Sequence, residues 1–222
     1  METIVCLAAH PDDIAYAMGG TLLRLKDRVR IHVLCVTKGQ RGLPGQDPDQ
    51  TAALREKEEQ AACDLLGAEL TFLEQMDGEV FAGEPLCRQV AGLLDGLAPS
   101  AVFTLWPIDN HPDHSAVSEI ARKAVRLSKA APPLIYYEAM YGVQAFQFRP
   151  DVYVDITDVM DRKVELIRCH VCQNLDDRMV QRAFPQCALR GSEAGCKYAE
   201  GFKFPRCPAM DPQALLTLGK RK

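Results

Sequence analysis

Short apolar runs alternate with longer segments along most of the chain. The runs have the length and the β-branched content of buried strands, and the segments between them carry apolar residues at helical spacing. The predicted strands span Ile4–Ala9, Arg30–Thr37, Glu69–Leu73, Ala101–Trp106, Leu134–Glu138 and Val152–Ile156. The predicted helices span Ile14–Asp27, Thr51–Leu66, Pro85–Gly96, Pro112–Ser128 and Asp161–His170.

Strands that alternate with helices predict an α/β fold with a mostly parallel sheet and helices on both faces, in the Rossmann-like arrangement. At 222 residues the chain is long enough for one sizeable core and short for two ordinary domains, so we expect a single domain over residues 1–222. The periodicity fades after Asn174. Residues 175–222 are therefore predicted to form an irregular, loop-rich extension of that domain.

The bulk composition excludes few classes of protein. A hydrophobic content of 47% and a charged content of 25% are typical of soluble globular proteins. The net charge of −4 argues against nucleic acid as a partner, and no apolar stretch approaches the roughly 20 residues of a membrane helix. Acidic Glu2 precedes the first strand, where a signal peptide would carry basic residues, so we expect a cytoplasmic protein.

The chain has nine cysteines, and five of them fall in its last quarter. Cys169 and Cys172 have the spacing of a zinc knuckle, which Cys187 and Cys196 could complete as a four-thiolate site. The spacing of that second pair is loose. Free thiols in a reducing compartment are therefore the favoured interpretation.

Two clusters of histidine and aspartate follow predicted strands. The sequence His10-Pro11-Asp12-Asp13 comes directly after the first strand, and His111-Pro112-Asp113-His114 comes shortly after the fourth. Ligands of α/β sheets bind outside the carboxyl ends of the strands, so we expect the two clusters to lie together. Because Pro112 suits the first turn of a helix, His111 and His114 should share one helix face.

These residue types suit a metal-dependent hydrolase. A catalytic zinc typically takes three protein ligands and leaves one position for water, and His10, Asp13 and His114 form such a set. Asp12 is then a carboxylate beside the metal that is available to take a proton from the activated water. The same ligand set also suits Fe(II) in a non-haem oxygenase, and one cluster alone could be a helix-capping turn. The alternating strands and helices and the spare base favour the hydrolase.

The chain resembles the LmbE/PIG-L family of zinc-dependent de-N-acetylases. The two clusters carry the resemblance, and weaker similarities at Thr37-Lys38-Gly39, Asp77-Gly78 and Ala199-Glu200-Gly201-Phe202 follow in family order. Ile14 stands where family members often carry an acidic residue, and Cys172 where a serine is common.

The resemblance implies a role for eight residues. The implied zinc ligands are His10, Asp13 and His114, the general base is Asp12, the cationic partner of the oxyanion or leaving amine is His111, the carboxylate that fixes an imidazole tautomer is Asp113, and the residues that hold sugar hydroxyls are Arg55 and Asp77. An alternative for Arg55 is a solvated helix arginine paired with Glu58 or Glu59. An alternative for Asp77-Gly78 is a simple turn.

The implied function is the removal of an acetyl group from a small N-acetylated amino sugar, an N-acetylglucosamine conjugate. The alternatives are an amidase acting on a thiol-sugar conjugate, an iron oxygenase and a catalytically silent sugar-binding protein. Zinc is the expected cofactor, with another divalent metal such as Fe²⁺ as the alternative, and the resemblance is compatible with a homo-oligomer. The substrate itself is left open; the loop Gly39–Asp49 and the chain after Asn174 are expected to set it.

Overall fold

A seven-stranded sheet forms the centre of the molecule in this computed structural model, which describes residues 1–139 and 145–205. The strands are β1 Glu2–Ala8, β2 Val29–Thr37, β3 Glu69–Gln75, β4 Ala101–Leu105, β5 Leu134–Tyr137, β6 Val152–Asp155 and β7 Ala199–Lys203. The helices are α1 Asp13–Leu25, α2 Pro48–Leu66, α3 Glu84–Leu97, α4 Pro112–Leu127, α5 Met160–Arg168 and α6 Arg178–Ala194, with short 3₁₀ turns at Thr157–Val159 and Leu175–Asp177.

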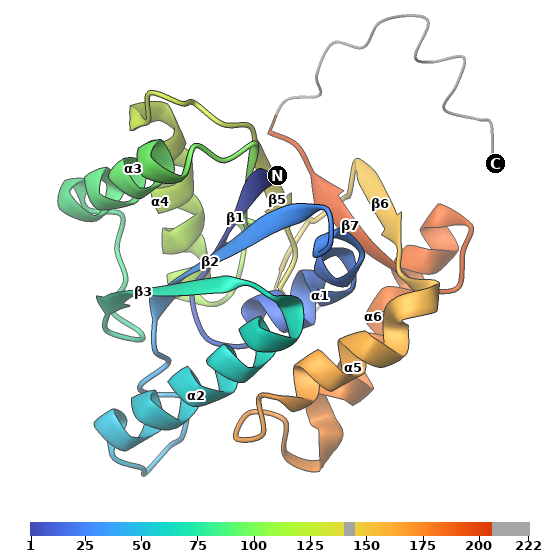
Figure 1. Cartoon of the computed structure of the whole chain (residues 1–222). Coiled ribbons are helices and arrows are strands. Elements are labelled where there is room, and N and C mark those ends of the chain that lie inside the picture. The colour runs from blue at the N-terminus through green and yellow to red at the C-terminus, as the bar shows by residue number, and fades with distance from the viewer. Residues whose placement is uncertain (140–144, 206–222) are drawn as a thin grey trace, which may run out of the picture.

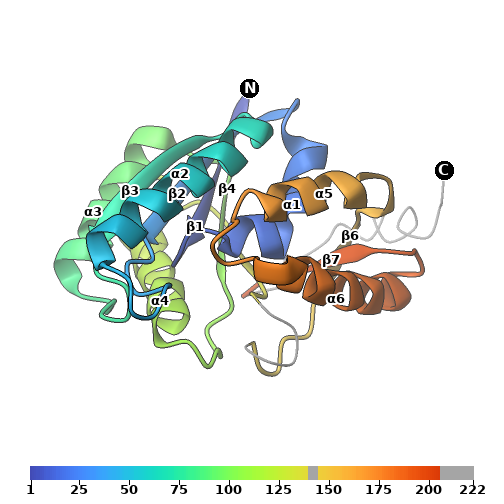
Figure 2. The ribbon, with the colours of Figure 1, turned by 90° about the horizontal axis from the view of Figure 1, so that it is seen from below.

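The sheet is mostly parallel and lies between two layers of helices. Its order is β3-β2-β1-β4-β5-β7-β6, in which β1 to β5 pair in parallel and β7 runs antiparallel to both of its neighbours. Helices α3 and α4 cover one face, while α1, α2, α5 and α6 gather on the other (Figures 1 and 2). The predicted Rossmann-like α/β fold is confirmed. Within the described residues no helix is long and apolar enough to cross a membrane.

The burial of β1 explains why the strands of the N-terminal half could be predicted from the sequence. Both faces of this strand are covered, so Val5, Cys6 and Leu7 are fully buried and form one continuous apolar run. Helix α1 packs closely against Ile156 at Gly20, where there is no room for a larger side chain. A Cβ atom at this position would lie 2.8 Å from the side chain of Ile156. Helix α2 begins at Pro48, three residues before its predicted start, because Asp47 caps it through the backbone N–H groups of Asp49 and Gln50.

The prediction of irregular structure after residue 175 is wrong for residues 178–203, which form α6 and β7. Strand β7 was not predicted because its second residue, Glu200, is charged although it is only 3% exposed, and so interrupts the apolar pattern of a buried strand. Its carboxylate lies 2.6 Å from the buried Lys163 ammonium and accepts hydrogen bonds from the backbone of Gly20 and Thr21. Helix α6 likewise contains a buried ion pair, between Arg190 and Glu138. Residues 206–222 lie outside the described part of the chain.

The late cysteines do not meet in a metal site within the described residues, where all eight cysteines are free thiols. The Cys172 thiol donates to the Glu58 carboxylate at 3.0 Å, and the Cys187 sulfur lies 3.6 Å from the Lys163 ammonium nitrogen. Cys169 and Cys196 each lie against a backbone carbonyl. The structure therefore supports free thiols, the favoured interpretation, and gives no support to a four-thiolate zinc site.

Candidate metal centre and catalytic pocket

The two histidine–aspartate clusters meet at the carboxyl ends of β1 and β4. These strands are neighbours, and the order of the sheet reverses between them, which is where ligands of such sheets bind. His10 follows β1, whereas His111 and His114 lie at the start of α4. A cavity of about 440 Å³ opens here, lined by residues of both clusters.

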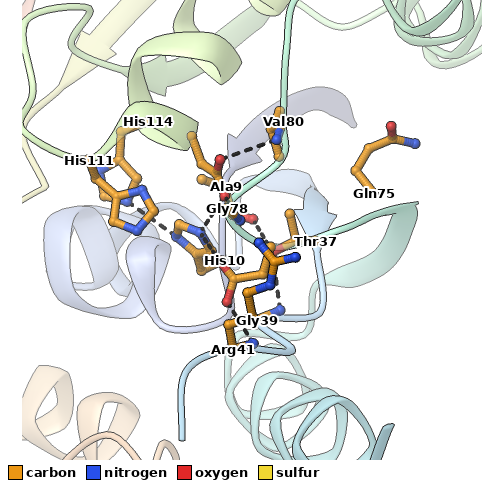
Figure 3. A network of polar contacts seen from close by, with 12 residues as sticks. Ala9, His10, Thr37, Gly39, Arg41, Gln75, Gly78, Val80, His111 and His114 are labelled. Atoms are coloured by element: carbon orange, nitrogen blue, oxygen red, sulfur yellow. Dashed lines mark hydrogen bonds and ion pairs between the residues drawn. The ribbon is translucent and has the colours of Figure 1, made fainter. Parts of the chain in front are cut away.

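Three donor atoms converge in the wall of this cavity. The Nδ1 atom of His10 lies 3.3 Å from Nε2 of His114, which lies 3.4 Å from Oδ1 of Asp13. The rings of His10 and His114 face each other in Figure 3. Tetrahedral ligands about 2.0–2.1 Å from a zinc ion are roughly 3.3–3.4 Å apart, so the two distances from Nε2 of His114 have the spacing of ligands of one ion. The contact between His10 and Asp13 is longer, because Nδ1 of His10 lies 3.9 Å from Oδ2 of Asp13.

The backbone between β1 and α1 fixes Asp13. Its Oδ2 atom accepts hydrogen bonds from the backbone N–H groups of Ala9 and His10, at 2.9 and 3.0 Å, and Oδ1 is left to face His114. Asp12 makes the turn with a φ of 99°, in the left-handed region that non-glycine residues rarely adopt. That conformation turns the two adjacent carboxylates in different directions, one toward the histidines and one toward Arg55.

Two carboxylates hold the other nitrogen of His10. Its Nε2 lies 3.1 Å from oxygens of both Asp113 and Asp77. Asp113 in turn accepts from the backbone N–H groups of Gly78 and Val80, which lie on the loop beside His10 in Figure 3. His10, Asp77 and Asp113 could themselves form a metal site. Because both carboxylates contact Nε2, we interpret them as groups that orient Nδ1 toward His114.

The pKa values of this group reflect the close contacts. Burial lowers the pKa of His10, but hydrogen bonds to Asp113 and Asp77 outweigh that effect and raise it to about 10. Burial raises the pKa of Asp77, but its contact with His10 outweighs burial and lowers the value to about 2. Asp77 thus orients His10, a candidate metal ligand. This role is additional to the contact with a sugar hydroxyl that the resemblance implied. The Asp77-Gly78 pair is also a turn, as the alternative had it.

Asp109 binds the nitrogen of His114 that faces away from the candidate metal site, as Asp113 does for His10. Its Oδ2 atom lies 3.0 Å from Nδ1 of His114, and its Oδ1 atom accepts from the backbone N–H of His111 at 2.7 Å. The position of Asp109, two residues before the second cluster, was the signal that could have assigned it a role.

Arg55 holds the carboxylate of Asp12. Its guanidinium donates to Asp12 Oδ2 at 3.0 Å and to the carbonyl of Pro11 at 2.6 Å. Arg55 is 4% exposed, so the alternative of a solvated arginine paired with Glu58 or Glu59 is wrong. Burial raises the pKa of Asp12 to about 6, although Arg55 acts to lower it. A carboxylate with such a pKa is suited to accept a proton near neutral pH.

Glu59 holds the backbone of Asp12 through a hydrogen bond, a role that the sequence did not predict. Its Oε2 atom accepts from the backbone N–H of Asp12 at 3.0 Å and lies 3.7 Å from Nε2 of His170. Burial raises the pKa of Glu59 to about 8 and lowers that of His170 to about 3, so both prefer their neutral forms. The signal was a glutamate on the apolar face of an otherwise charged helix.

His111 lies beside the three donors and points into the cavity. Its ring centroid is 4.5 Å from that of His10, and the buried Nδ1 atom has no hydrogen-bond partner. The donor atoms of His10, His111 and His114 lie within 4.8 Å of one another, so His111 is within reach of the same ion. Burial and the neighbouring histidines lower the pKa of His111. This environment favours a neutral imidazole, contrary to the predicted cationic partner.

The outer wall of the cavity comes from the two segments expected to set specificity. Arg41 and Gly42 belong to the loop after β2, and Arg178 and Arg182 belong to α6. Apart from the two clusters, Arg55 and Asp77, the cavity is also lined by Tyr16, Gly78, Ala139, Gln173 and Met179. The arginines of α6 were not predicted, because that helix was not recognised.

Comparisons with known proteins agree with this geometry. A family model for PIG-L, described as GlcNAc-PI de-N-acetylase, matches residues 5–125, a range that contains both clusters. The chain also superposes on N,N′-diacetylchitobiose deacetylase from Pyrococcus horikoshii with a TM-score of 0.83, at 25% identity, over 97% of this chain and 88% of that one.

Curated relatives include two kinds of enzyme. The diacetylchitobiose deacetylase of Thermococcus kodakarensis is 29% identical over 92% of this chain and 83% of its own length. A probable N-acetyl-α-D-glucosaminyl L-malate deacetylase of Bacillus cereus is 29% identical over 77% of this chain and 83% of its own. The 4-oxalmesaconate hydratase of Pseudomonas putida is 26% identical over 92% of this chain and 90% of its own.

Proposed function

Since the chain belongs to the PIG-L family of de-N-acetylases, we propose that it is a metal-dependent hydrolase that removes the acetyl group from an N-acetylated amino-sugar conjugate. One observation carries the proposal. Donor atoms of His10 and Asp13 lie 3.3 and 3.4 Å from Nε2 of His114, the spacing of ligands of one zinc ion, and they share a cavity with Asp12, whose carboxylate is not among these donors and has a pKa of about 6.

In this proposal His10, Asp13 and His114 hold a zinc ion, or another divalent metal such as Fe²⁺. When bound, the metal would polarise the acetamide carbonyl and lower the pKa of water to about 7. The two histidines are held in place through their remaining nitrogens, His10 by Asp113 and Asp77 and His114 by Asp109. Each of these contacts sets which ring nitrogen faces the site.

Asp12 is the proposed general base. Its carboxylate lines the cavity next to the donor atoms, where it takes a proton from the attacking water and passes it toward the leaving amine. Arg55 keeps this carboxylate ionised and in place, since it binds Oδ2 and opposes the rise in pKa that burial causes. Glu59 holds the backbone of the same residue.

His111 is the proposed partner of the oxyanion. Its ring lies in the cavity wall beside the donor atoms, where a neutral imidazole can donate one N–H to the oxygen of the tetrahedral intermediate. In this proposal His111 acts as a neutral hydrogen-bond donor, instead of the cationic partner predicted from the resemblance. Arg55 and Asp77 also line the cavity, and we retain them as candidate contacts for sugar hydroxyls.

An acetate-release assay tests the function. The purified protein should release acetate and a free amine in equal amounts from at least one N-acetylglucosamine conjugate, and a chelator should abolish the release until metal is restored. Acetate release without metal dependence would contradict the mechanism. Oxygen consumption would indicate an oxygenase, and binding of the sugar without turnover a silent sugar-binding protein.

The similarity to 4-oxalmesaconate hydratase supports a second candidate, the addition of water to an unsaturated organic acid. The same base and metal ligands could activate water for that reaction. The two candidates differ in their products, because a hydratase adds water to a double bond and releases no acetate. Loss of the ultraviolet absorbance of an unsaturated dicarboxylate, without acetate release, would favour the hydratase.

A further inference from the structure

We propose that the outer wall of the cavity binds an anionic group of the substrate, a carboxylate or a phosphate, through Arg178 and Arg182. This group lies on the part of the conjugate remote from the acetamide. The inference rests on the proposed deacetylase function and deepens it, because it specifies that the preferred conjugate is an acidic one.

Charge is unevenly distributed around the cavity. The acidic residues that line it are Asp12, Asp13 and Asp77, all of which contact the histidines or Arg55 at the metal end. The outer wall carries Arg178 and Arg182 from α6, and no acidic residue of α6 lines the cavity within the described part of the chain. A substrate with an anionic outer part would bring the complementary charge to this side of the cavity.

Arg178 is held in an orientation that leaves its fork available. Its Nε atom donates to the carbonyl oxygen of Gln173 at 2.7 Å, which fixes the plane of the guanidinium. Neither of its Nη atoms has a hydrogen-bond or ion-pair partner among residues 1–139 and 145–205. The adjacent acid, Asp177, does not neutralise it, because both Asp177 oxygens are bound to Arg168. Two free Nη groups in one plane suit bidentate binding of a carboxylate or phosphate.

Arg182 follows one helical turn later and lines the same cavity. Residues four apart share a helix face, so the two cations point to the same region. Arg182 also lies close enough to Tyr16, another wall residue, to act against the rise that burial causes in the pKa of that phenol. Arg41, on the opposite segment, differs from Arg178 because its guanidinium is paired with Glu79.

The position of these arginines in the chain separates them from the reaction chemistry. The family model covers residues 5–125, which include the candidate metal ligands and Asp12, whereas α6 lies outside that range. Recognition of an anion can therefore vary between relatives that share the same hydrolytic centre.

Three conjugates, two cavity variants and one control variant test the inference. The conjugates are N-acetylglucosaminyl L-malate, its dimethyl ester, which has nearly the same shape without the charge, and N-acetylglucosamine 1-phosphate. The double variant R178Q/R182Q removes both cations. The single variant R178Q removes only the guanidinium whose two Nη groups are available for the anion. The control variant R162Q removes an exposed arginine of α5 that does not line the cavity.

We expect the native enzyme to favour an acidic conjugate over the ester by at least about tenfold in kcat/KM, since a charged hydrogen bond is worth about that much. The double variant should lose this preference through a higher KM with little change in kcat, and R162Q should keep it. The better of the malate and phosphate conjugates identifies the anion. Equal cleavage of acid and ester by the native enzyme, or a parallel loss of both in the variant, would overturn the inference.

Failure of the proposed function has a different signature. If no conjugate releases acetate, the deacetylase proposal fails, and calorimetric titration of the same conjugates decides the anion site separately. The acidic conjugate should then bind the native protein about tenfold more tightly than it binds R178Q/R182Q. Equal binding to both proteins would overturn the anion site as well.

Discussion

The Nδ1 atom of His10 lies 3.3 Å from the Nε2 atom of His114, although the two residues are 104 positions apart in the chain. They meet because β1 and β4 are neighbours in the sheet and both residues follow the carboxyl ends of these strands. Carboxylates bind the far nitrogen of each ring, which leaves the two facing nitrogens for a shared ion. From this relationship follow the proposed metal site and the reaction built around it.

Replacement of Asp12 by asparagine should lower kcat by about 10²–10⁴-fold, because the amide cannot accept the proton of water. Metal content should not change, because Asp12 is not among the proposed ligands. The measurement is kcat together with metal content by mass spectrometry. Asp27→Asn, at an exposed position after α1, is the control and should behave like the native enzyme. Near-normal turnover in Asp12→Asn would mean that another group is the base.

Replacement of Asp109 by asparagine should weaken metal binding by about 10–100-fold. The amide oxygen can still accept from the backbone of His111, but it cannot also provide a carboxylate for Nδ1 of His114. Zinc affinity can be measured by competition with a chromophoric chelator. Asp161→Asn, on the exposed side of α5, is the matched control. Unchanged affinity in Asp109→Asn would show that His114 does not need this partner.

Removal of the charge of Arg55 should move the acidic limb of the rate profile to higher pH. Activity requires ionised Asp12, whose pKa is about 6 with Arg55 acting to lower it. In Arg55→Gln the ionised form loses that support, so its pKa should rise by about one unit. The profile of kcat/KM against pH checks this, with Arg55→Lys as the variant that keeps the charge. An acidic limb that stays in place would show that Asp12 does not control it.

Glu59 should make the metal-free protein less stable at high pH. Its folded-state pKa of about 8 lies above the ordinary value of 4.5, so its favourable contribution is complete below pH 4.5 and is lost as the pH rises through 8. Glu59→Gln keeps an acceptor for Asp12 and cannot ionise. Between pH 6 and 9 the native chain should lose roughly 1–3 kcal/mol more unfolding free energy than the variant. Urea titrations at both pH values measure this, and parallel losses would contradict it.

The N-terminal part of the fold was predictable because its strands are buried on both faces. Such strands appear in the sequence as continuous apolar runs, as at Val5–Ala8, and glycine marks the ends of elements, as at Gly67 with its φ of 65°. The C-terminal part was not predictable by the same criteria. Glu200 and Arg190 are charged yet buried, and only their partners, Lys163 and Glu138, make this tolerable.

In the candidate site, too, some residues could be predicted from the sequence pattern and others depend on contacts that only the fold creates. His10, Asp13 and His114 could be predicted to lie together as candidate ligands because they belong to two short clusters at strand ends. Asp109 and Glu59 gave only weak signals in the sequence, a position two residues before the second cluster and a glutamate on an apolar helix face, because their roles depend on contacts made by folding. The neutral preference of His111 is also a product of burial, which the sequence pattern does not show.

Anomalous diffraction at the zinc edge, from crystals grown with zinc, tests the central claim most directly. The account predicts one strong peak about 2.0–2.1 Å from His10 Nδ1, Asp13 and His114 Nε2. A peak on the other side of the ring, between His10 Nε2, Asp77 and Asp113, would contradict it. So would a peak bound by His111 in place of Asp13, or the absence of any peak at this end of the sheet.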